Sequence, residues 1–215
     1  MITAHWITET VSVTSGVSPS LLFDYGGFPP ESYKYEYPAP GSPMLASRVS
    51  ELLSTCEIPV NLDESRKWDH GVFVPMMLMY PAANIPVVSL SLQAPLDPQL
   101  HIRIGRALAP LRNEGVLLIG SGMTFHNFDY FFTRDSKKRE IGIRHSHIWN
   151  DYLLETLKSG NISREEQLTR LGSWSTCPSA IEANPLGREE HLIPLLVVLG
   201  AADEEDECSL LGPLC

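Results

Sequence analysis

The sequence predicts a single α/β domain with a central mixed, largely parallel sheet flanked by helices. Two observations favour this class. Segments with strand-like and helix-like periodicity alternate along the chain, and no internal repeat or Pro- and Gly-rich linker divides it. A chain of 215 residues is also long enough to bury one sizeable core. We therefore expect one domain over residues 1–202, followed by an acidic, disordered tail over residues 203–215.

The first half of the chain begins with a strand over residues 2–8, in which side chains alternate between two faces. Residues 23–43 are rich in Gly, Pro and Tyr, which predicts a long ordered loop of the kind that often carries function. Ser42 and Pro43 then begin a helix as its N-cap and first residue. Two elements follow: a short strand near residues 58–60 and an apolar helix over residues 69–81.

The middle of the chain continues the same alternation. Residues 85–92 form an apolar strand, and Asp97 with Pro98 begins an amphipathic helix. Residues 115–122 form a buried strand that runs into a Gly-rich turn. Three helices are expected in the last third: one around residues 146–158, one beginning at Ser163 with Glu166 as its capping-box partner, and one over residues 189–202.

Charge and composition exclude several classes of partner. The formal net charge is −10, and residues 203–207 supply five of the 26 acidic residues. Basic residues form no stripe, and the Lys-Lys-Arg run at 137–139 is expected in an exposed loop, so nucleic acid is not an expected partner. No apolar run reaches about 18 residues and no signal peptide is visible, so we expect a cytoplasmic protein without membrane contact.

The four cysteines lie far apart in the sequence and show no metal-binding spacing. We expect all of them to be reduced thiols: Cys56, Cys177, Cys208 and Cys215.

Four of the seven histidines fall at the edges of predicted elements, where ligands bind in α/β proteins: His5, His70, His126 and His191. Each also has a purely structural interpretation. Taken alone, His5 is more often a hydrogen-bonded polar residue of a strand than a ligand, and His70 is more often a residue bonded to its own turn. The side chain of His126 could bond the Gly-rich turn, and Glu190 could pair with His191.

The other three histidines, His101, His145 and His147, are expected on polar surfaces. No HExxH or similar local metal motif is present, so local spacing alone does not choose between these interpretations.

Five short motifs, taken in order, carry a resemblance to a known family. They are AHW at 4–6, FDYGGFP at 23–29, DHGVFVP at 69–75, GSGMTFHN at 120–127 and EEHLIPL at 189–195. Together they resemble the DODA-type extradiol ring-cleavage dioxygenases of the LigB-like superfamily. The resemblance covers roughly residues 2–134 and 188–202.

The resemblance implies a mononuclear Fe(II) enzyme, with Zn(II) as the alternative bound metal. It implies that His5 and His191 are metal ligands and that Glu190 is a reserve ligand. His126 is implied as the catalytic acid–base group, with metal ligation as its second possible role.

Three further residues complete the site that the resemblance implies. His70 is expected to orient the substrate or O₂. Asp69 is expected to bind substrate, to fix the tautomer of His70 or to fix the loop. The aromatic pocket is expected to include Tyr25 and Phe28, for which core packing is the alternative.

The implied activity is extradiol cleavage of a small, DOPA-like catechol by O₂ to a muconic semialdehyde, catalysed by a monomer or homodimer. Family members carry a third histidine ligand in an ISHGSP-like segment upstream of AHW, and this sequence contains no such segment. We therefore expect the domain to be N-terminally incomplete. The alternative function is that of an inactive truncated member or a protein that only binds its ligand.

Overall fold

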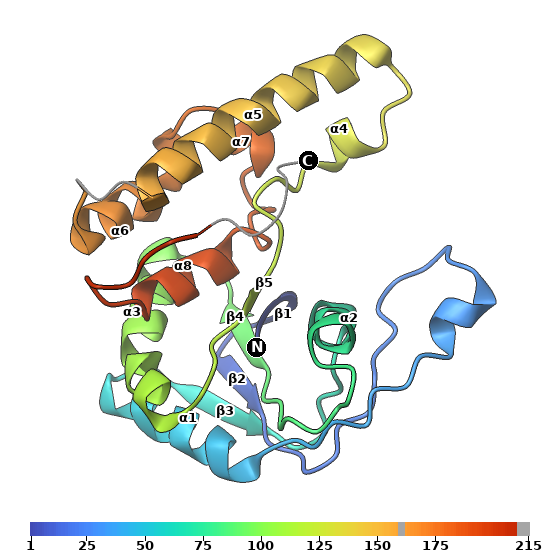
Figure 1. The fold of residues 1–215 in the computed structure, drawn as a ribbon, viewed down its shortest axis with the longest axis vertical. Helices are drawn as coiled ribbons and strands as arrows, with labels where there is room; N and C mark the ends of the chain where they lie inside the picture. The colour runs from blue at the N-terminus through green and yellow to red at the C-terminus, as the bar shows by residue number, and fades with distance from the viewer. Residues whose placement is uncertain (159–161, 210–215) are drawn as a thin grey trace.

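Five strands form one mixed sheet in the order β3-β2-β4-β1-β5, which confirms the predicted α/β class. The structure is a computed structural model that describes residues 1–158 and 162–209. Strand β1 pairs in parallel with β4 on one side and with β5 on the other, while β2 runs antiparallel to β4 and parallel to β3 (Figure 1).

The elements that the structure describes are, in chain order, β1 (Ile2–Thr8), β2 (Val11–Thr14), the 3₁₀ turn η1 (Pro30–Tyr33), α1 (Pro43–Thr55), β3 (Val60–Asp63), α2 (His70–Met79), β4 (Leu90–Gln93), α3 (Pro98–Leu108), η2 (Ala109–Glu114), β5 (Gly120–Ser121), α4 (Phe128–Phe131), α5 (Ser136–Lys158), α6 (Arg164–Gly172), η3 (Trp174–Thr176), α7 (Ala180–Ala183) and α8 (Ile193–Gly200).

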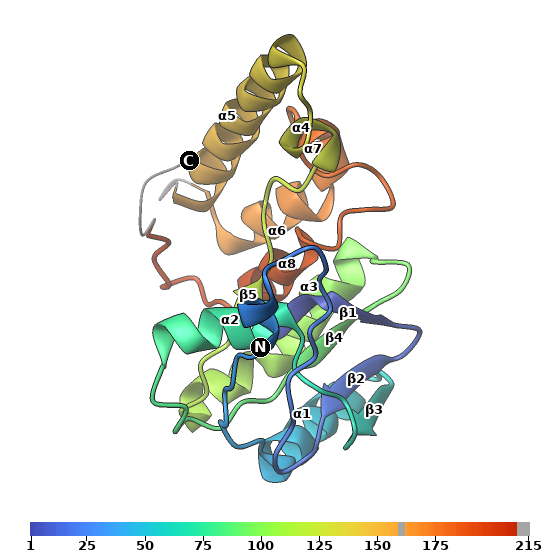
Figure 2. The same ribbon diagram turned by 90° about the vertical axis from the view of Figure 1, so that its right-hand side faces the viewer.

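Helices cover both faces of the sheet. The larger hydrophobic core packs α1, α3 and α8 against apolar side chains of β1, β2 and β4. A smaller core on the other side surrounds α2 and includes Trp68, Phe73 and Tyr37. In two perpendicular views, α4, α5 and α7 lie beyond one end of this layered body (Figures 1 and 2). Strand β1, which carries His5, therefore lies inside the sheet with cover on both faces.

Three of the predicted helix starts are confirmed by their capping hydrogen bonds. The Ser42 side chain accepts from the Leu45 N–H at 3.2 Å, and Asp97 caps α3 in the same way. Ser163 accepts from the Glu166 N–H at 3.2 Å. These side chains satisfy N–H groups that have no partner within their own helices.

Helix α8 crosses α3 at very close range, and a glycine makes this possible. A Cβ atom placed on Gly105 of α3 would lie 2.0 Å from the backbone oxygen of Val197 in α8. Any larger residue would push α8 away. This contact holds the second half of α8 against α3.

Several boundaries differ from those expected. Strand β2 was not predicted, and the expected strand over residues 85–92 is reduced to β4, because the Val87 N–H bonds Pro40 in the long loop rather than a strand. Of the strand expected at 115–122, two residues pair as β5. Gly115 adopts a left-handed conformation with φ of 77° and turns the chain just before that stretch.

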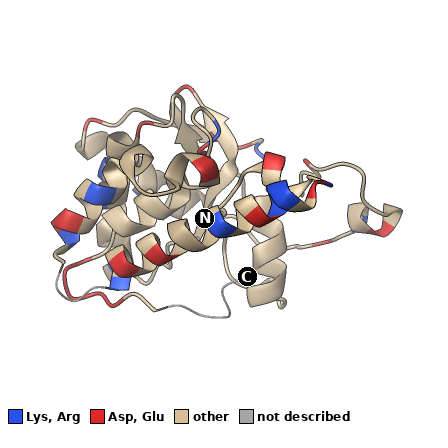
Figure 3. Cartoon of the chain, turned by 90° about the horizontal axis from the view of Figure 1, so that it is seen from above, with Lys and Arg blue, Asp and Glu red and all other residues tan. Residues whose placement is uncertain are grey.

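The surface differs from expectation at two places. Helix α5 begins ten residues earlier than the helix expected from residue 146, so the exposed basic run at 137–139 is helical rather than part of a loop. Figure 3 shows Lys and Arg interspersed with Asp and Glu along the helices. Within the described residues no helix is long and apolar enough to cross a membrane.

The expectation that His101 lies on the surface is wrong. Its side chain is fully buried, with Nδ1 2.7 Å from the carbonyl oxygen of Asp97 and Nε2 accepting the Gln93 N–H at 3.1 Å. It thereby links the start of α3 to the end of β4. Of the other two histidines expected on the surface, His147 is exposed and His145 is half-buried beside Ser179.

The described part of the acidic tail contacts the body of the domain. Arg112 forms ion pairs with Asp203 at 3.0 Å and with Asp206 at 2.6 Å. The Glu204 carboxylate accepts the backbone N–H of Arg164 at 3.0 Å. Cys56, Cys177 and Cys208 are free thiols, and Cys215 lies outside the described residues.

Candidate metal centre

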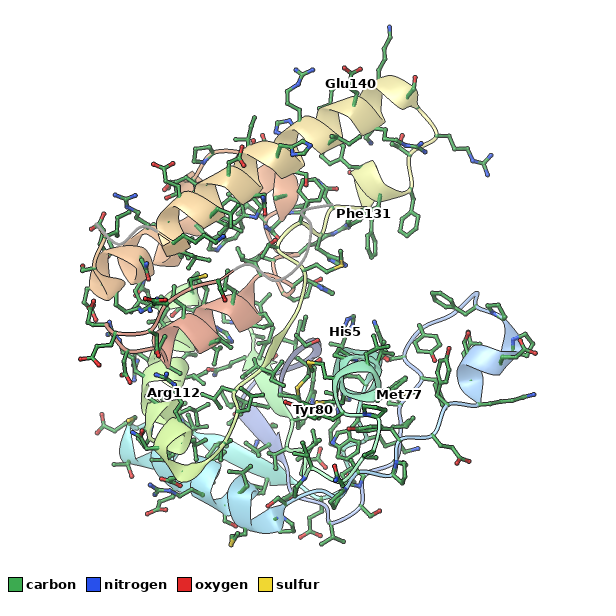
Figure 4. All side chains as sticks on the ribbon, in the orientation of Figure 1. His5, Met77, Tyr80, Arg112, Phe131 and Glu140 are labelled. Atoms are coloured by element: carbon green, nitrogen blue, oxygen red, sulfur yellow. The ribbon has the colours of Figure 1, made fainter. Side chains whose placement is uncertain are left out.

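Four histidines from four separate segments meet at one place. His5 lies in β1, His70 is the first residue of α2, His126 follows β5, and His191 precedes α8. The ring centre of His5 lies 3.9 Å from that of His70 and 4.8 Å from that of His191. The rings of His126 and His191 stack at 3.5 Å. Figure 4 shows His5 beside α2. These contacts bring together the four histidines singled out in the sequence.

The strand that carries His5 is fixed to the start of α2 by a buried carboxylate. Asp69 accepts a hydrogen bond from the Thr3 hydroxyl at 2.7 Å and forms an ion pair with Arg66 at 3.0 Å. Its side chain is 1% exposed. The two partners engage both carboxylate oxygens, so Asp69 positions β1 against α2.

The partner of the His70 ring is Asp24, which corrects the expectation that Asp69 fixes its tautomer. One oxygen of Asp24 lies 2.8 Å from His70 Nδ1 and accepts the His70 backbone N–H at 2.9 Å. The second oxygen lies 3.7 Å from His5 Nδ1. Asp24 was not selected from the sequence. The available signal was a single carboxylate within the aromatic loop motif FDYGGFP.

The loop that carries His126 is held by the C-terminal helical region. The His126 N–H donates to the carbonyl oxygen of Ala183 at 2.9 Å. The carbonyl oxygen of Thr124 accepts from the Trp149 indole N–H at 2.6 Å and from the Asn184 side chain at 2.9 Å. Residues 135–187, where the family resemblance was weak, thus supply the support for this histidine.

A glycine allows this loop to approach His191. A Cβ atom on Gly122 would lie 2.2 Å from the backbone oxygen of His191. The Gly-rich turn GSG therefore brings the backbones that carry His126 and His191 into direct contact.

The electrostatics of the cluster favour unprotonated rings. Burial, together with the nearby His126, His5 and His70, lowers the pKa of His191 to about 3. Burial also lowers the pKa of His126, an effect partly opposed by Glu190, whose carboxylate lies 3.7 Å from His126 Nδ1. The pKa of His5 is lowered by burial and by His70. At neutral pH these rings carry free lone pairs, as metal ligands must.

The donor set fits a divalent transition metal. Within the described chain, the buried Nδ1 of His191 has no hydrogen-bond partner. Donor atoms of His126, Glu190 and His191 lie within 4.8 Å of one another, and so do those of His5, Asp24 and His70. Neutral imidazoles combined with a carboxylate are the ligands typical of non-haem Fe(II) and of Zn(II).

Aromatic side chains flank the cluster on two sides. The Tyr25 ring lies 5.6 Å from that of His70, and Phe28 packs against Tyr25 at 5.3 Å. On the other side, the ring of Phe128 in α4 lies 4.5 Å from that of His126. Phe28 and Phe128 are both more than half exposed. Phe128 was not predicted, because its proximity depends on the fold of the loop after β5.

A cavity of about 670 Å³ lies elsewhere, between α1, α2 and residues 115–119, and contains none of these histidines. Its lining is mostly apolar and includes Met44, Tyr80, Leu90 and Leu118. The chemistry of the side chains, rather than the size of a cavity, therefore identifies the histidine cluster as the candidate site.

Comparison with known proteins identifies the family of the chain. The family model described as the catalytic LigB subunit of aromatic ring-opening dioxygenase matches residues 1–211. The chain is 39% identical to a 4,5-DOPA dioxygenase extradiol of Beta vulgaris, covering 98% of this chain and 75% of that protein. It is 37% identical to the dioxygenase tasH of Hapsidospora irregularis, covering 96% of this chain and 64% of that protein.

A solved structure shares the fold. It is that of an uncharacterized protein from Escherichia coli K12, with a TM-score of 0.73, 33% identity, and coverage of 95% of this chain and 75% of that chain. The chain thus spans three quarters of the length of the Beta vulgaris and Escherichia coli proteins and 64% of that of tasH. Because the family model matches nearly the whole chain and the histidine cluster lies within that match, the protein belongs to the LigB family of aromatic ring-opening dioxygenases.

Proposed function

We propose that this chain is an extradiol ring-cleavage dioxygenase that uses Fe(II) and O₂ to open a small catechol of the DOPA class. The observation that carries the proposal is the convergence of four histidines, from four segments, with ring centres 3.5 to 4.8 Å apart between neighbours. Membership of the LigB family and the similarity to 4,5-DOPA dioxygenases support the reaction and the substrate class.

His5 and His191 are the residues that would hold the metal, with Glu190 as a nearby oxygen donor. The rings of His5 and His191 meet edge to face at 86°, an arrangement in which lone pairs from the two rings can converge. When bound there, Fe(II) supplies the acidity of the catechol hydroxyl and the redox chemistry that O₂ requires. Two histidines with one carboxylate form a ligand set typical of non-haem Fe(II) oxygenases.

His126 is better placed for proton transfer than for joining His191 as a ligand. Their rings are nearly parallel, at 18°, and lie 3.5 Å apart face to face. Imidazole lone pairs lie in the plane of the ring, so those of two stacked rings do not meet at one point. A neutral His126 can instead take a catechol proton and later return it, with the Glu190 carboxylate close to its Nδ1.

The remaining residues of the site bind and orient the substrate. His70 is partly exposed and supplies a hydrogen-bonding group beside His5. Tyr25 and Phe28 on one side and Phe128 on the other supply apolar ring surfaces suited to a planar aromatic compound. The proposed partners are therefore a small catechol and O₂.

The proposal is tested by loading the chain with Fe(II) without oxygen, adding DOPA and then admitting O₂. We expect oxygen uptake in step with the absorbance of a yellow semialdehyde. His126→Ala should abolish turnover while the metal is retained, and His147→Ala, an exposed histidine of α5, should behave like the wild type.

Two results would contradict the proposal. Metal bound without any oxygen uptake, across a panel of catechols, would favour the alternative of a protein that only binds its ligand. Unchanged turnover in His126→Ala would remove this histidine from proton transfer.

A further inference from the structure

Asp24 has no role in the activity derived above, yet it contacts the site twice. It lies in the loop between β2 and α1, between Phe23 and Tyr25. One carboxylate oxygen receives both the backbone N–H of His70 and the ring nitrogen Nδ1, at 2.9 and 2.8 Å. The other oxygen lies 3.7 Å from His5 Nδ1, which is too long for a hydrogen bond.

These contacts determine which nitrogen of His70 carries the proton. An ionised carboxylate only accepts hydrogen bonds, so Nδ1 must donate. In a neutral imidazole, Nε2 is then left as an acceptor. Burial alone would raise the pKa of Asp24, but hydrogen bonds from the backbone and ring of His70 outweigh it and hold that pKa below its ordinary value.

The position of Asp24 is itself fixed by the neighbouring backbone. Just before the aspartate, the Leu22 N–H donates to the carbonyl oxygen of Trp68 at 2.7 Å, and the Trp68 N–H donates to that of Ser20 at 2.9 Å. These bonds join the loop to the segment that leads into α2. Asp24 therefore meets His70 across a short, doubly hydrogen-bonded connection.

A metal-ligand role for Asp24 fits the contacts less well. Donor atoms of His5, Asp24 and His70 do lie within 4.8 Å of one another. However, the oxygen nearest His70 already accepts two hydrogen bonds, and the His70 Nδ1 is used in one of them. A cation bound through His70 Nδ1 would have to displace the ring hydrogen bond to Asp24.

We propose that Asp24 is a positioning residue that holds His70 in the Nδ1–H tautomer, so that Nε2 accepts a hydrogen bond from a hydroxyl of the bound catechol. The second half of this statement rests on the proposed function. Asp24 also links the aromatic loop to the hydrogen bond between His70 and the catechol. Tyr25 is the next residue in the sequence, and its ring lies beside that of His70.

The tautomer can be observed directly by NMR. The full chain, free of metal and labelled with ¹⁵N-histidine, gives a distinct long-range ¹H–¹⁵N pattern for each tautomer, and His70→Gln assigns the His70 signal. We expect the Nδ1–H pattern in the wild type and its loss in Asp24→Ala. Asp24→Asn, whose side-chain oxygen can still accept both bonds, should restore it. Glu36→Ala, an exposed acidic residue of the same loop, is the matched control and should leave it unchanged.

Kinetics test the second half. With Fe(II) bound, Asp24→Ala should raise the KM for DOPA about tenfold, the effect of one lost hydrogen bond of ordinary strength, with a smaller change in kcat. Adding His70→Gln to Asp24→Ala should cause little further loss, because both changes remove the same interaction.

Three results would overturn the assignment. They are an unchanged His70 pattern in Asp24→Ala, a loss of bound metal in that variant equal to the loss in His5→Ala, and additive kinetic effects in the double variant. The NMR measurement needs no turnover. A chain that cleaves no catechol would therefore refute the proposed function, while the spectra would still decide whether Asp24 sets the tautomer.

Discussion

Gly122→Ala should damage the metal centre although residue 122 carries no functional side chain. The added Cβ would lie 2.2 Å from the backbone oxygen of His191 and 3.1 Å from its carbonyl carbon. Cβ atoms essentially never approach other atoms within 3.0 Å, so the two backbones must separate by about 0.8 Å. The clash is with backbone and no flexible side chain can swing aside to relieve it.

The size of the effect follows from that displacement. The loop after β5 is held by hydrogen bonds to Ala183 and Asn184. The start of α8, just after His191, packs closely against Gly120 of β5, so neither segment can move freely. A misplacement of about 1 Å near reacting groups can cost roughly 100-fold in rate. We expect kcat/KM to fall by about that factor, and the free energy of unfolding to fall by about 1–3 kcal/mol.

The assay is oxygen uptake with DOPA on Fe(II)-loaded protein, with urea unfolding measured in parallel. Gly26→Ala is the matched control, because a Cβ there meets nothing within 4 Å. Activity of Gly122→Ala within twofold of the control, in a stably folded protein, would refute the argument that this contact sets the distance between His126 and His191.

Three further predictions concern stability and substrate binding. Asp69→Ala removes buried bonds to Thr3 and Arg66, so urea unfolding should show a loss of roughly 3 kcal/mol, and a loss below about 1 kcal/mol would contradict the role assigned to Asp69. Burial lowers the pKa of His101, so the unfolded chain binds a proton on this residue more readily. The contribution of His101 to the free energy of unfolding should be complete above about pH 6.5 and should decline as the pH falls below that value. This pH dependence should weaken in His101→Phe, and an unchanged dependence would contradict the assignment. Phe128→Ala should raise the KM for DOPA several-fold with little effect on the unfolding midpoint, because the ring is half exposed; an unchanged KM would exclude the ring from the substrate site.

Local sequence signals predicted the α/β class and the three capped helix starts well. Ser42, Asp97 and Ser163 cap their helices as expected, because a cap depends on residues within one turn. Strand lengths were predicted less well. The stretch over residues 85–92 has strand-like composition, but the bond from Val87 to Pro40 is a long-range contact that no local pattern contains.

The site was predicted in part for the same reason. The four histidines stood out at the edges of elements, and the structure brings them together. Asp24 lies 46 residues before its partner His70, and only the fold places them in contact. The prediction for His101 was wrong because it treated a polar side chain as a surface residue. The burial of His101 depends on its contacts with Gln93 of β4 and with Asp97, which the fold creates.

The most direct test of the account is an anaerobic Fe(II) titration by calorimetry of the wild type, His5→Ala, His191→Ala and the control His147→Ala. If His5 and His191 form the metal centre, the wild type and the control should bind a single ion per chain with equal affinity. His5→Ala and His191→Ala should each lower the affinity for Fe(II) by at least about 10- to 100-fold. That is the loss of metal affinity typical of removing a residue that only supports a ligand. Equal affinity in all four proteins, or no binding in the wild type, would contradict the assignment of this histidine cluster as the metal centre.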